Sequence, residues 1–277
     1  MKPLAGKIVL LTGASGGLGT YIAHALAEAG TDLALVAYPG AGLEELRQQV
    51  VKAGRLAIAM PSDLRLPEQQ LYVVAQTRKE FGRIDVLVNN AGVEFTAAYH
   101  NLTEEEIRSV LAVNLDAPLL LSRLVLPEML ERGSGHIVNM SSLAGKSGPA
   151  YQEPYAATKA GLIAFTTSLR ATYHGTGVSA SVICPGFVEA GIYARLKERT
   201  GVAAPAILGT SPPEAVARAV IRAIENDLPE VIINAYPVRP LFALTALFPR
   251  FGAWLIRQIG AHDFFRRVIE ARNQKQG

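Results

Sequence analysis

Residues 7–29 read KIVLLTGASGGLGTYIAHALAEA: a short apolar run, a glycine-rich turn and then apolar residues at helical spacing. This order predicts a β-strand, a tight turn and an α-helix at the start of a βαβ unit. Glycines in such a turn let the backbone approach a pyrophosphate, and the N-terminus of the next helix offers free N–H groups. A glycine turn alone is not specific, but its position in this unit predicts a dinucleotide-binding site.

The alternation of strand and helix continues along the chain. We predict strand 33–37, helix 43–51, strand 56–60, helix 68–81, strand 84–88, a long helix from the capping box at 103–106 to about Arg132, and strand 136–140. Such an order predicts an α/β fold, a Rossmann-type doubly wound parallel sheet. We expect residues 1–235 to form the dinucleotide-binding and catalytic domain, and residues 236–277 to form an amphipathic helical C-terminal extension.

The composition indicates a globular protein without long disordered segments. Hydrophobic residues make up 49% of the 277 and charged residues 18%, and there is no repeat. Cys184 is the only cysteine, which excludes an intrachain disulfide and suits a reducing compartment. The N-terminus shows no cleavage-site pattern, so we expect a cytoplasmic protein. A net charge of +3 without basic clusters among aromatics argues against nucleic acid.

Tyr155 and Lys159 lie four residues apart in a predicted helix, so their side chains share one face. A tyrosine hydroxyl titrates near pH ~10, and lowering its pKa by roughly three units takes about 4 kcal/mol, which a close ammonium in a partly dry site can supply. We therefore expect Lys159 to lower the pKa of Tyr155, so that the phenol exchanges protons at neutral pH. An ordinary solvated pair is the alternative.

Polar residues follow the predicted strands, where open α/β sheets bind ligands. Asp63 follows the third strand, Asn89 and Asn90 the fourth, and Ser141 and Ser142 the one at 136–140. All of these are also common turn residues. Asn114 lies among apolar neighbours of the long helix, so it either braces the fold or holds a water chain, because an unpaired buried amide costs about 1–3 kcal/mol.

The motifs together resemble those of the short-chain dehydrogenase/reductase family over about residues 5–235. They are Thr12-Gly13-x-x-x-Gly17-x-Gly19, Asn89-Asn90-Ala91-Gly92, Asn114, Ser141-Ser142, Tyr155-x-x-x-Lys159 and Pro185-Gly186, in this order and spacing. The resemblance implies an NAD(P)-dependent alcohol dehydrogenase or carbonyl reductase that transfers a hydride between the cofactor and an alcohol or ketone. It also implies a homo-oligomer. The chain lacks the glycine-rich finish of the family's tetramers, so we expect a homodimer.

The resemblance also implies the role of each position. Ser142 would bind the substrate oxygen, Tyr155 would exchange its proton, and Asn114 would hold a water that relays protons through Lys159. Lys159 would also bind the nicotinamide ribose hydroxyls, and Tyr155 would also contact the cofactor. The other expected cofactor-binding residues are Gly13, Ser15, Gly17, Leu18, Gly19, Tyr38, Asp63, Leu64, Asn90, Ala91, Gly92, Pro185, Gly186 and Val188. No metal site is expected.

The sequence does not choose between NAD and NADP. After the second strand, Ala37-Tyr38-Pro39 supplies neither an acid for a ribose hydroxyl nor an arginine for a phosphate, and Gly16 leaves the glycine turn without a basic residue. Ala190 stands where the family often has a threonine that contacts the carboxamide. One cofactor hydrogen bond is therefore expected to be missing.

The substrate is expected to be apolar. Residues 191–210 lie where the family has a mobile lid, and their apolar side chains favour a lipid, steroid or fatty-chain substrate over a sugar. Glu94 is expected either to contact the substrate or, as the more ordinary alternative, to be a solvated loop carboxylate. A non-catalytic cofactor-binding sensor or scaffold is the rival function, although such chains usually lose Tyr155 or Lys159.

The C-terminal extension has two interpretations. The apolar run at 241–248 is too short to span a bilayer, which takes roughly 20 residues. Two helical faces follow, one with Phe251, Trp254, Leu255 and Ile259 and one with Phe264, Phe265, Val268 and Ile269, and residues 250–277 carry a net charge of +4. These faces pack on the lid or on a sister subunit, or they lie on an anionic membrane surface.

Overall fold

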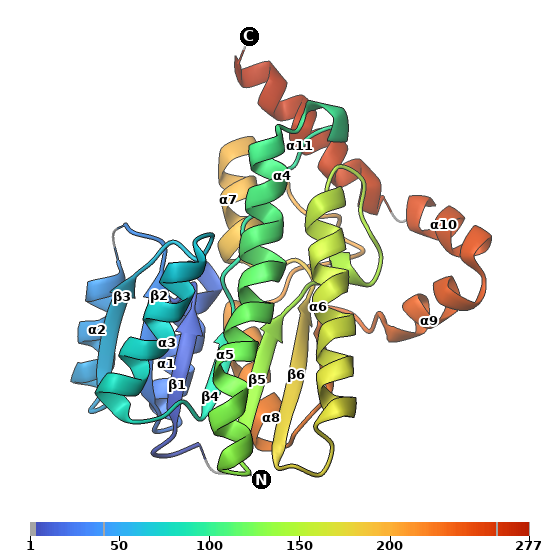
Figure 1. Cartoon of the computed structure of the whole chain (residues 1–277). Helices are drawn as coiled ribbons and strands as arrows, with labels where there is room; N and C mark the ends of the chain where they lie inside the picture. Colours follow the sequence, from blue (N-terminus) through green and yellow to red (C-terminus); the bar gives the residue numbers. More distant parts are fainter. Residues whose placement is uncertain (1–3, 41, 259, 277) are drawn as a thin grey trace.

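The computed structural model describes residues 4–40, 42–258 and 260–276, and its centre is a parallel sheet in the order β3-β2-β1-β4-β5-β6-β7 (Figure 1). The strands are β1 Ile8–Thr12, β2 Asp32–Ala37, β3 Ala57–Pro61, β4 Val86–Asn89, β5 Gly135–Met140, β6 Val178–Pro185 and β7 Glu230–Ile233. The order reverses between β1 and β4, where the carboxyl ends of the strands open a crevice for ligands. The predicted doubly wound fold is confirmed.

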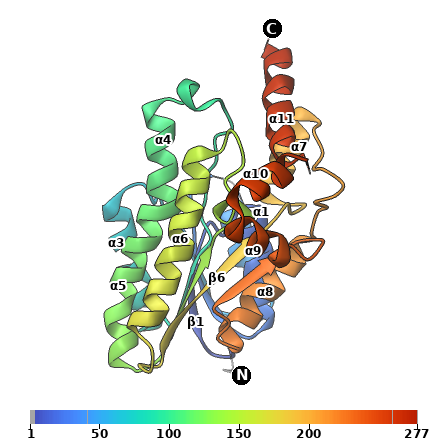
Figure 2. The same cartoon turned by 90° about the vertical axis from the view of Figure 1, so that its right-hand side faces the viewer.

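Helices cover both faces of the sheet. Their bounds are α1 Gly17–Glu28, α2 Leu43–Lys52, α3 Pro67–Phe81, α4 Glu104–Leu111, α5 Ala117–Glu131, α6 Glu153–Thr172, α7 Gly191–Thr200, α8 Pro213–Glu225, α9 Arg239–Leu247, α10 Pro249–Gln258 and α11 Ala261–Gln276. Helices α1, α2 and α8 pack on one face, and α3, α5 and α6 pack on the other (Figures 1 and 2). Strands β1 and β2 are buried along their whole length, which explains their continuous apolar runs.

The predicted long helix is interrupted by one wider turn. A capping box closed by Thr103 and Glu106 opens α4, and a π-helical turn at Ala112–Asp116 joins α4 to α5. Such turns are rare and frequently lie at functional sites. This one carries Asn114, whose side chain is completely buried. Residues Glu104–Glu131 have the length and composition to cross a membrane, but the inner face of α5, with Leu121 and Val125, packs on the sheet.

Helices α9 to α11 follow β7 (Figure 2). Helix α11 packs on α7 and buries Phe264 against Tyr193 and Phe187. Helices α9 and α10 form a hairpin in which a side chain added at Gly252 would lie 2.6 Å from the Thr245 Cα. Of the two interpretations of the C-terminal extension, packing on the lid therefore holds for α11. Ile259, which the sequence places on the same helical face as Phe251, lies outside the described residues.

Candidate functional site

The turn after β1 is built from glycines because the backbone approaches itself there. A Cβ at Gly19 would lie 2.0 Å from the Gly13 oxygen, and one at Gly13, whose φ is +64°, would lie 2.7 Å from the Ala91 Cα. Thr12 Oγ1 accepts hydrogen bonds from the backbone N–H groups of Asn90 and Ala91 at 3.0 Å. These contacts fix the ends of β1 and β4 side by side at the crevice.

Two adjoining cavities run along the carboxyl ends of the strands. The larger, of about 390 Å³, lies near Tyr38 and Asp63, and the other, of about 180 Å³, lies near Tyr155 and Lys159. Gly13, Ala91 and Gly92 line both cavities, so the two form one elongated groove. Every residue that the sequence predicts to bind the cofactor lines one or both of them.

The sequence places the adenine at the end of the groove near Tyr38 and Asp63. This end contains two polar groups that were not predicted, the Ser62 hydroxyl and the Arg65 guanidinium. The Ser62 hydroxyl is buried and has no hydrogen-bond partner within the described residues, and the residue lines the larger cavity. The Arg65 guanidinium lies 5.7 Å from the centre of the Tyr38 ring and pairs with Asp63 at 2.6 Å. This pairing lowers the pKa of Asp63. The only signal in the sequence was their position beside Asp63.

Tyr155 lies in the first turn of α6, and Ser142 lies just beyond β5. Both residues line the cavity, and the Ser142 hydroxyl lies near enough to the phenol to favour its ionised form. Burial raises the pKa of Tyr155 to about 12, and the Ser142 contact opposes this shift only partly. The expectation that Lys159 lowers this pKa is wrong for the free protein, because the loss of hydration of the phenolate outweighs the favourable interactions.

Lys159 is almost fully buried one helical turn after Tyr155. Its Nζ donates a hydrogen bond to the Met140 carbonyl oxygen at 2.7 Å and lies 5.5 Å from the centre of the Tyr155 ring. Burial lowers the pKa of Lys159 to about 8. The pair is therefore not an ordinary solvated one.

Asn114 braces the loop after β4. Its Oδ1 accepts from the Val93 N–H at 2.8 Å, and its Nδ2 donates to the Val93 carbonyl at 2.8 Å. Its Oδ1 and the Lys159 Nζ each lie 3.6 Å from the position that a Cβ on Gly92 would occupy. Asn114 and Lys159 therefore border the same small space, and the water role of Asn114 stays a prediction.

Glu94 is not the solvated carboxylate that the more ordinary alternative described. Its Oε1 accepts hydrogen bonds from the Thr96 hydroxyl and, at 2.9 Å, from the Gln152 amide. Burial raises the pKa of Glu94, and nearby arginines, Arg272 first among them, oppose the shift. Arg272 of α11 also donates to the Thr96 carbonyl at 2.8 Å. The C-terminal helix is thereby tied to the loop beside Tyr155.

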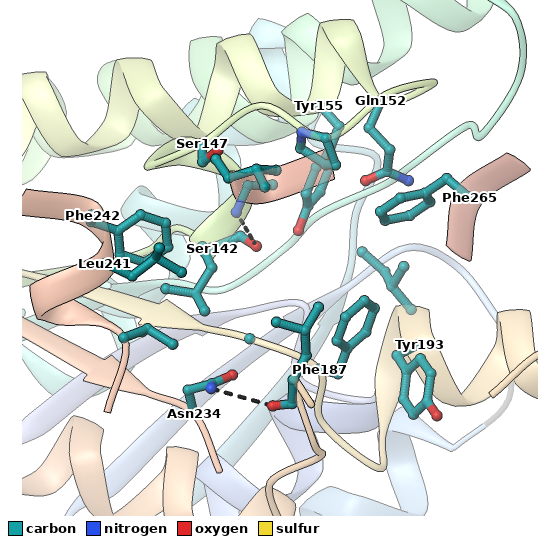
Figure 3. A pocket seen from close by; sticks show the side chains of 18 of the residues that line it. Ser142, Ser147, Gln152, Tyr155, Phe187, Tyr193, Asn234, Leu241, Phe242 and Phe265 are labelled. Carbon is teal, nitrogen blue, oxygen red and sulfur yellow. Dashed lines mark hydrogen bonds between the residues drawn. The ribbon is translucent and has the colours of Figure 1, made fainter. Parts of the chain in front are cut away.

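A third cavity, of about 190 Å³, opens beside the Tyr155 and Ser142 hydroxyls (Figure 3). Its walls are largely apolar and come from the expected lid and from the C-terminal helices. They include Phe187, Tyr193, Leu196, Leu241, Phe242, Ile256 and Phe265. The expected lid contains the helix α7. Nothing in the sequence indicated that α9, α10 and α11 line this cavity.

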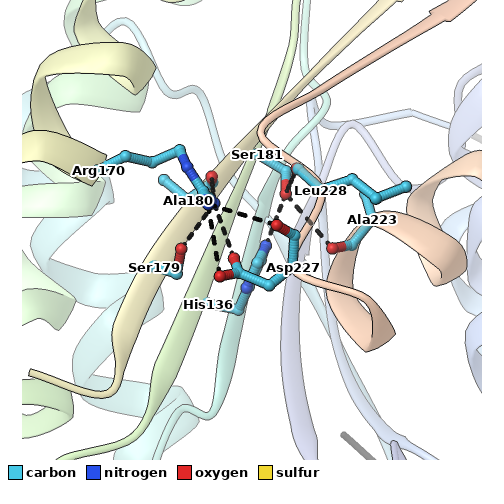
Figure 4. A network of polar contacts seen from close by, with 8 residues as sticks. All are labelled: His136, Arg170, Ser179, Ala180, Ser181, Ala223, Asp227 and Leu228. Carbon is cyan, nitrogen blue, oxygen red and sulfur yellow. Dashed lines mark hydrogen bonds and ion pairs between the residues drawn. The ribbon is translucent and has the colours of Figure 1, made fainter. Parts of the chain in front are cut away.

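A second polar network lies at the opposite, amino-terminal ends of β5 and β6 (Figure 4). Arg170 contacts Asp227 and the Ala180 carbonyl, each at 2.7 Å, and the Ser181 hydroxyl lies 2.8 Å from His136 Nε2. Ser181 also donates to the Leu228 carbonyl at 2.6 Å. The network ties the loop before β7 to the sheet and lines none of the three cavities.

Comparisons with known proteins agree with this geometry. A family model described as short chain dehydrogenase matches residues 7–201. The ketoacyl reductase HetN of Nostoc sp. is 43% identical over 277 residues, which cover 98% of this chain and 96% of that protein. The 3-oxoacyl-(acyl-carrier-protein) reductase FabG of Vibrio cholerae is 34% identical over 78% of this chain and 89% of its own length. A crystal structure of a metagenomic short-chain oxidoreductase in complex with NADP is 32% identical, with a TM-score of 0.71 over 84% of this chain and 98% of that one.

Proposed function

This chain belongs to the short-chain dehydrogenase/reductase family, and on that premise we propose that it reduces the keto group of a fatty-chain 3-oxoacyl substrate with NADPH. The oxidoreductase class follows from the family. The substrate class rests on one observation: the cavity beside the Tyr155 and Ser142 hydroxyls is walled by aliphatic and aromatic side chains. An acyl chain gains free energy by leaving water for such a wall, whereas a sugar would lose hydrogen bonds there.

The groove fits a dinucleotide. Glycines leave the backbone of residues 13–19 open to a pyrophosphate at the start of α1, where free N–H groups favour an anion. The buried Ser62 hydroxyl, which has no partner within the described residues, offers a hydrogen bond at the other end of the groove. When bound there, the reduced nicotinamide supplies a hydride to the keto carbon.

NADPH is favoured over NADH by Arg65. This guanidinium lies beside Tyr38, which follows β2, where the adenine ribose of a dinucleotide is read. Its partner Asp63 neutralises it in the free protein. A 2′-phosphate carries more charge than a carboxylate and accepts a bidentate arginine contact equally well.

Ser142 and Tyr155 line the same cavity, where a keto oxygen can accept a hydrogen bond from both hydroxyls. With a pKa of about 12, Tyr155 is protonated at neutral pH, which is the state that a proton donor needs. As charge develops on the keto oxygen, Ser142 stabilises it and Tyr155 donates its proton. The Lys159 charge, 5.5 Å from the ring centre, stabilises the phenolate that remains.

A substrate panel tests this function. The full-length protein is mixed with NADPH and 3-oxoacyl thioesters of increasing chain length, with a steroid ketone and a sugar ketone as comparisons, and absorbance at the nicotinamide band is followed. We expect kcat/KM to rise with acyl length until the cavity is filled. A higher kcat/KM for the steroid or the sugar would overturn the substrate assignment. No turnover of any substrate, with intact cofactor binding, would favour the sensor or scaffold alternative.

A further inference from the structure

We propose that the turn between α9 and α10 docks on an anionic phospholipid surface. The docking surface consists of four exposed apolar side chains at this turn, together with two arginines. The four are Leu247, Phe248, Phe251 and Trp254, which are 73%, 59%, 46% and 48% exposed. This proposal does not depend on the catalytic assignment, because it concerns another surface and has its own readout.

The exposed phenylalanine and tryptophan side chains are concentrated rather than scattered. Within the described residues, every exposed phenylalanine and tryptophan lies between 248 and 254. The Phe251 and Trp254 rings lie on one helical face with their centroids 5.5 Å apart. Contiguous exposed apolar patches of this kind mark interaction sites on proteins, and tryptophan is enriched at the level of lipid headgroups.

The charge of the hairpin matches an anionic surface. Residues 239–258 contain three arginines and no aspartate, glutamate or lysine. Arg250 and Arg257 are exposed, and neither forms an ion pair among the residues that the structure places. Aromatic side chains beside unpaired arginines are the composition of helices that lie in the membrane interface. Each such arginine gains free energy from the potential of anionic lipids.

A second copy of the chain fits this surface less well. Four partly exposed side chains offer on the order of 400 Å², about half of the roughly 800 Å² per partner in a stable interface. A two-fold contact would also place Arg250 and Arg257 near their own copies, and such like charges repel.

The position of the hairpin suits an enzyme that draws an apolar substrate from a membrane. Figure 1 shows α9 and α10 standing out from the body of the molecule. The inner side of the hairpin lines the apolar cavity through Leu241, Phe242 and Ile256. The docking surface lies on the outer side of the same hairpin. A lipid surface there would adjoin the cavity wall.

Trp254 is the only tryptophan of the chain, so its fluorescence reports directly on this surface. Vesicles of phosphatidylglycerol and phosphatidylcholine, or of phosphatidylcholine alone, are added to the full-length protein. We expect a blue shift of the emission and co-sedimentation with the anionic vesicles only, both weakened by 0.5 M salt. An unchanged spectrum and no co-sedimentation with anionic vesicles would overturn the proposal.

Variants separate the apolar contribution to vesicle binding from the electrostatic one. Phe251→Ser with Trp254→Ser should weaken co-sedimentation by about tenfold or more, and Arg250→Glu with Arg257→Glu by about thirtyfold or more. The matched controls are Leu71→Ser with Tyr72→Ser on α3 and Arg218→Glu with Arg222→Glu on α8, which are also exposed and should bind as the wild type does. Equal losses in the controls would contradict the proposal. So would a concentration-dependent dimer that Phe251→Ser with Trp254→Ser dissociates in the absence of lipid.

Discussion

The ammonium of Lys159 lies 5.5 Å from the centre of the Tyr155 ring, and it donates its hydrogen bond to the Met140 carbonyl oxygen at the end of β5. The two groups respond to burial in opposite senses. Burial raises the pKa of Tyr155 to about 12 and lowers the pKa of Lys159 to about 8, because it disfavours the charged form of each group. The free protein therefore holds a proton donor ready for reduction.

Tyr155→Phe removes this donor and should lower turnover by about a hundredfold or more. Cofactor affinity should change little, because the phenyl ring keeps the shape of the cavity wall. Turnover in single-turnover mixing and NADPH affinity by fluorescence titration check the two parts. Turnover above a tenth of the wild-type value would contradict the role of Tyr155.

Lys159→Met should change how stability depends on pH. Because the folded pKa of Lys159 is about 8, the unfolded chain binds a proton between pH 8 and about 10.4 that the folded protein lacks. Below pH 8, Lys159 is charged in both states, and the full cost of burying this charge opposes folding. As pH rises through the interval this cost disappears, so the unfolding free energy increases. The variant should lack this rise.

At neutral pH, Lys159→Met removes a burial cost of roughly 3 kcal/mol and loses a hydrogen bond worth about 1–2 kcal/mol. A net gain of roughly 1–2 kcal/mol in unfolding free energy is expected, with loss of turnover and of cofactor affinity. Denaturant unfolding at pH 7, 9 and 10.5 measures the unfolding free energy. If the unfolding free energies of the variant and the wild type changed with pH in parallel, burial would not lower the pKa of Lys159.

Phe264→Ala should destabilise the junction between α11 and the lid. Phe264 is fully buried and contacts the rings of Phe187, Tyr193 and Phe265. Removing a ring from such a site costs about 3–5 kcal/mol. Phe248→Ala, at an exposed position between α9 and α10, is the matched control and should cost less than about 0.5 kcal/mol. Similar melting temperatures for the two variants would show that α11 is not docked as described.

Arg65→Ala should weaken NADPH binding roughly tenfold and leave NADH binding nearly unchanged, because only NADPH carries the 2′-phosphate. Arg47→Ala is the control, since Arg47 forms a similar ion pair with Glu44 on the outside of α2. Equal losses for NADH and NADPH would assign Arg65 to the adenine or to the fold. The determinant of cofactor choice would then lie elsewhere.

Much of the fold follows from local sequence. Residues 7–29 predicted β1, the glycine turn and α1, and the predicted strand bounds differ from the observed ones by one or two residues. Apolar runs and glycine positions report on neighbours in the chain, so they can be interpreted without a structure. Four of the six motifs come at the ends of strands, and all parallel strands end at one edge, so these motifs predicted residues that line the groove.

The rest depends on segments that meet only in the folded chain. Arg272 contacts Thr96 across 176 positions, and Phe264 packs on Tyr193 of the lid, some seventy residues earlier. Arg65 lies in the loop after β3 and contacts Tyr38, which follows β2. The directions in which the pKa values of Tyr155, Lys159 and Glu94 shift also depend on the tertiary structure. Hydration of a charge depends on everything packed around it, whereas sequence spacing shows only which side chains share an element.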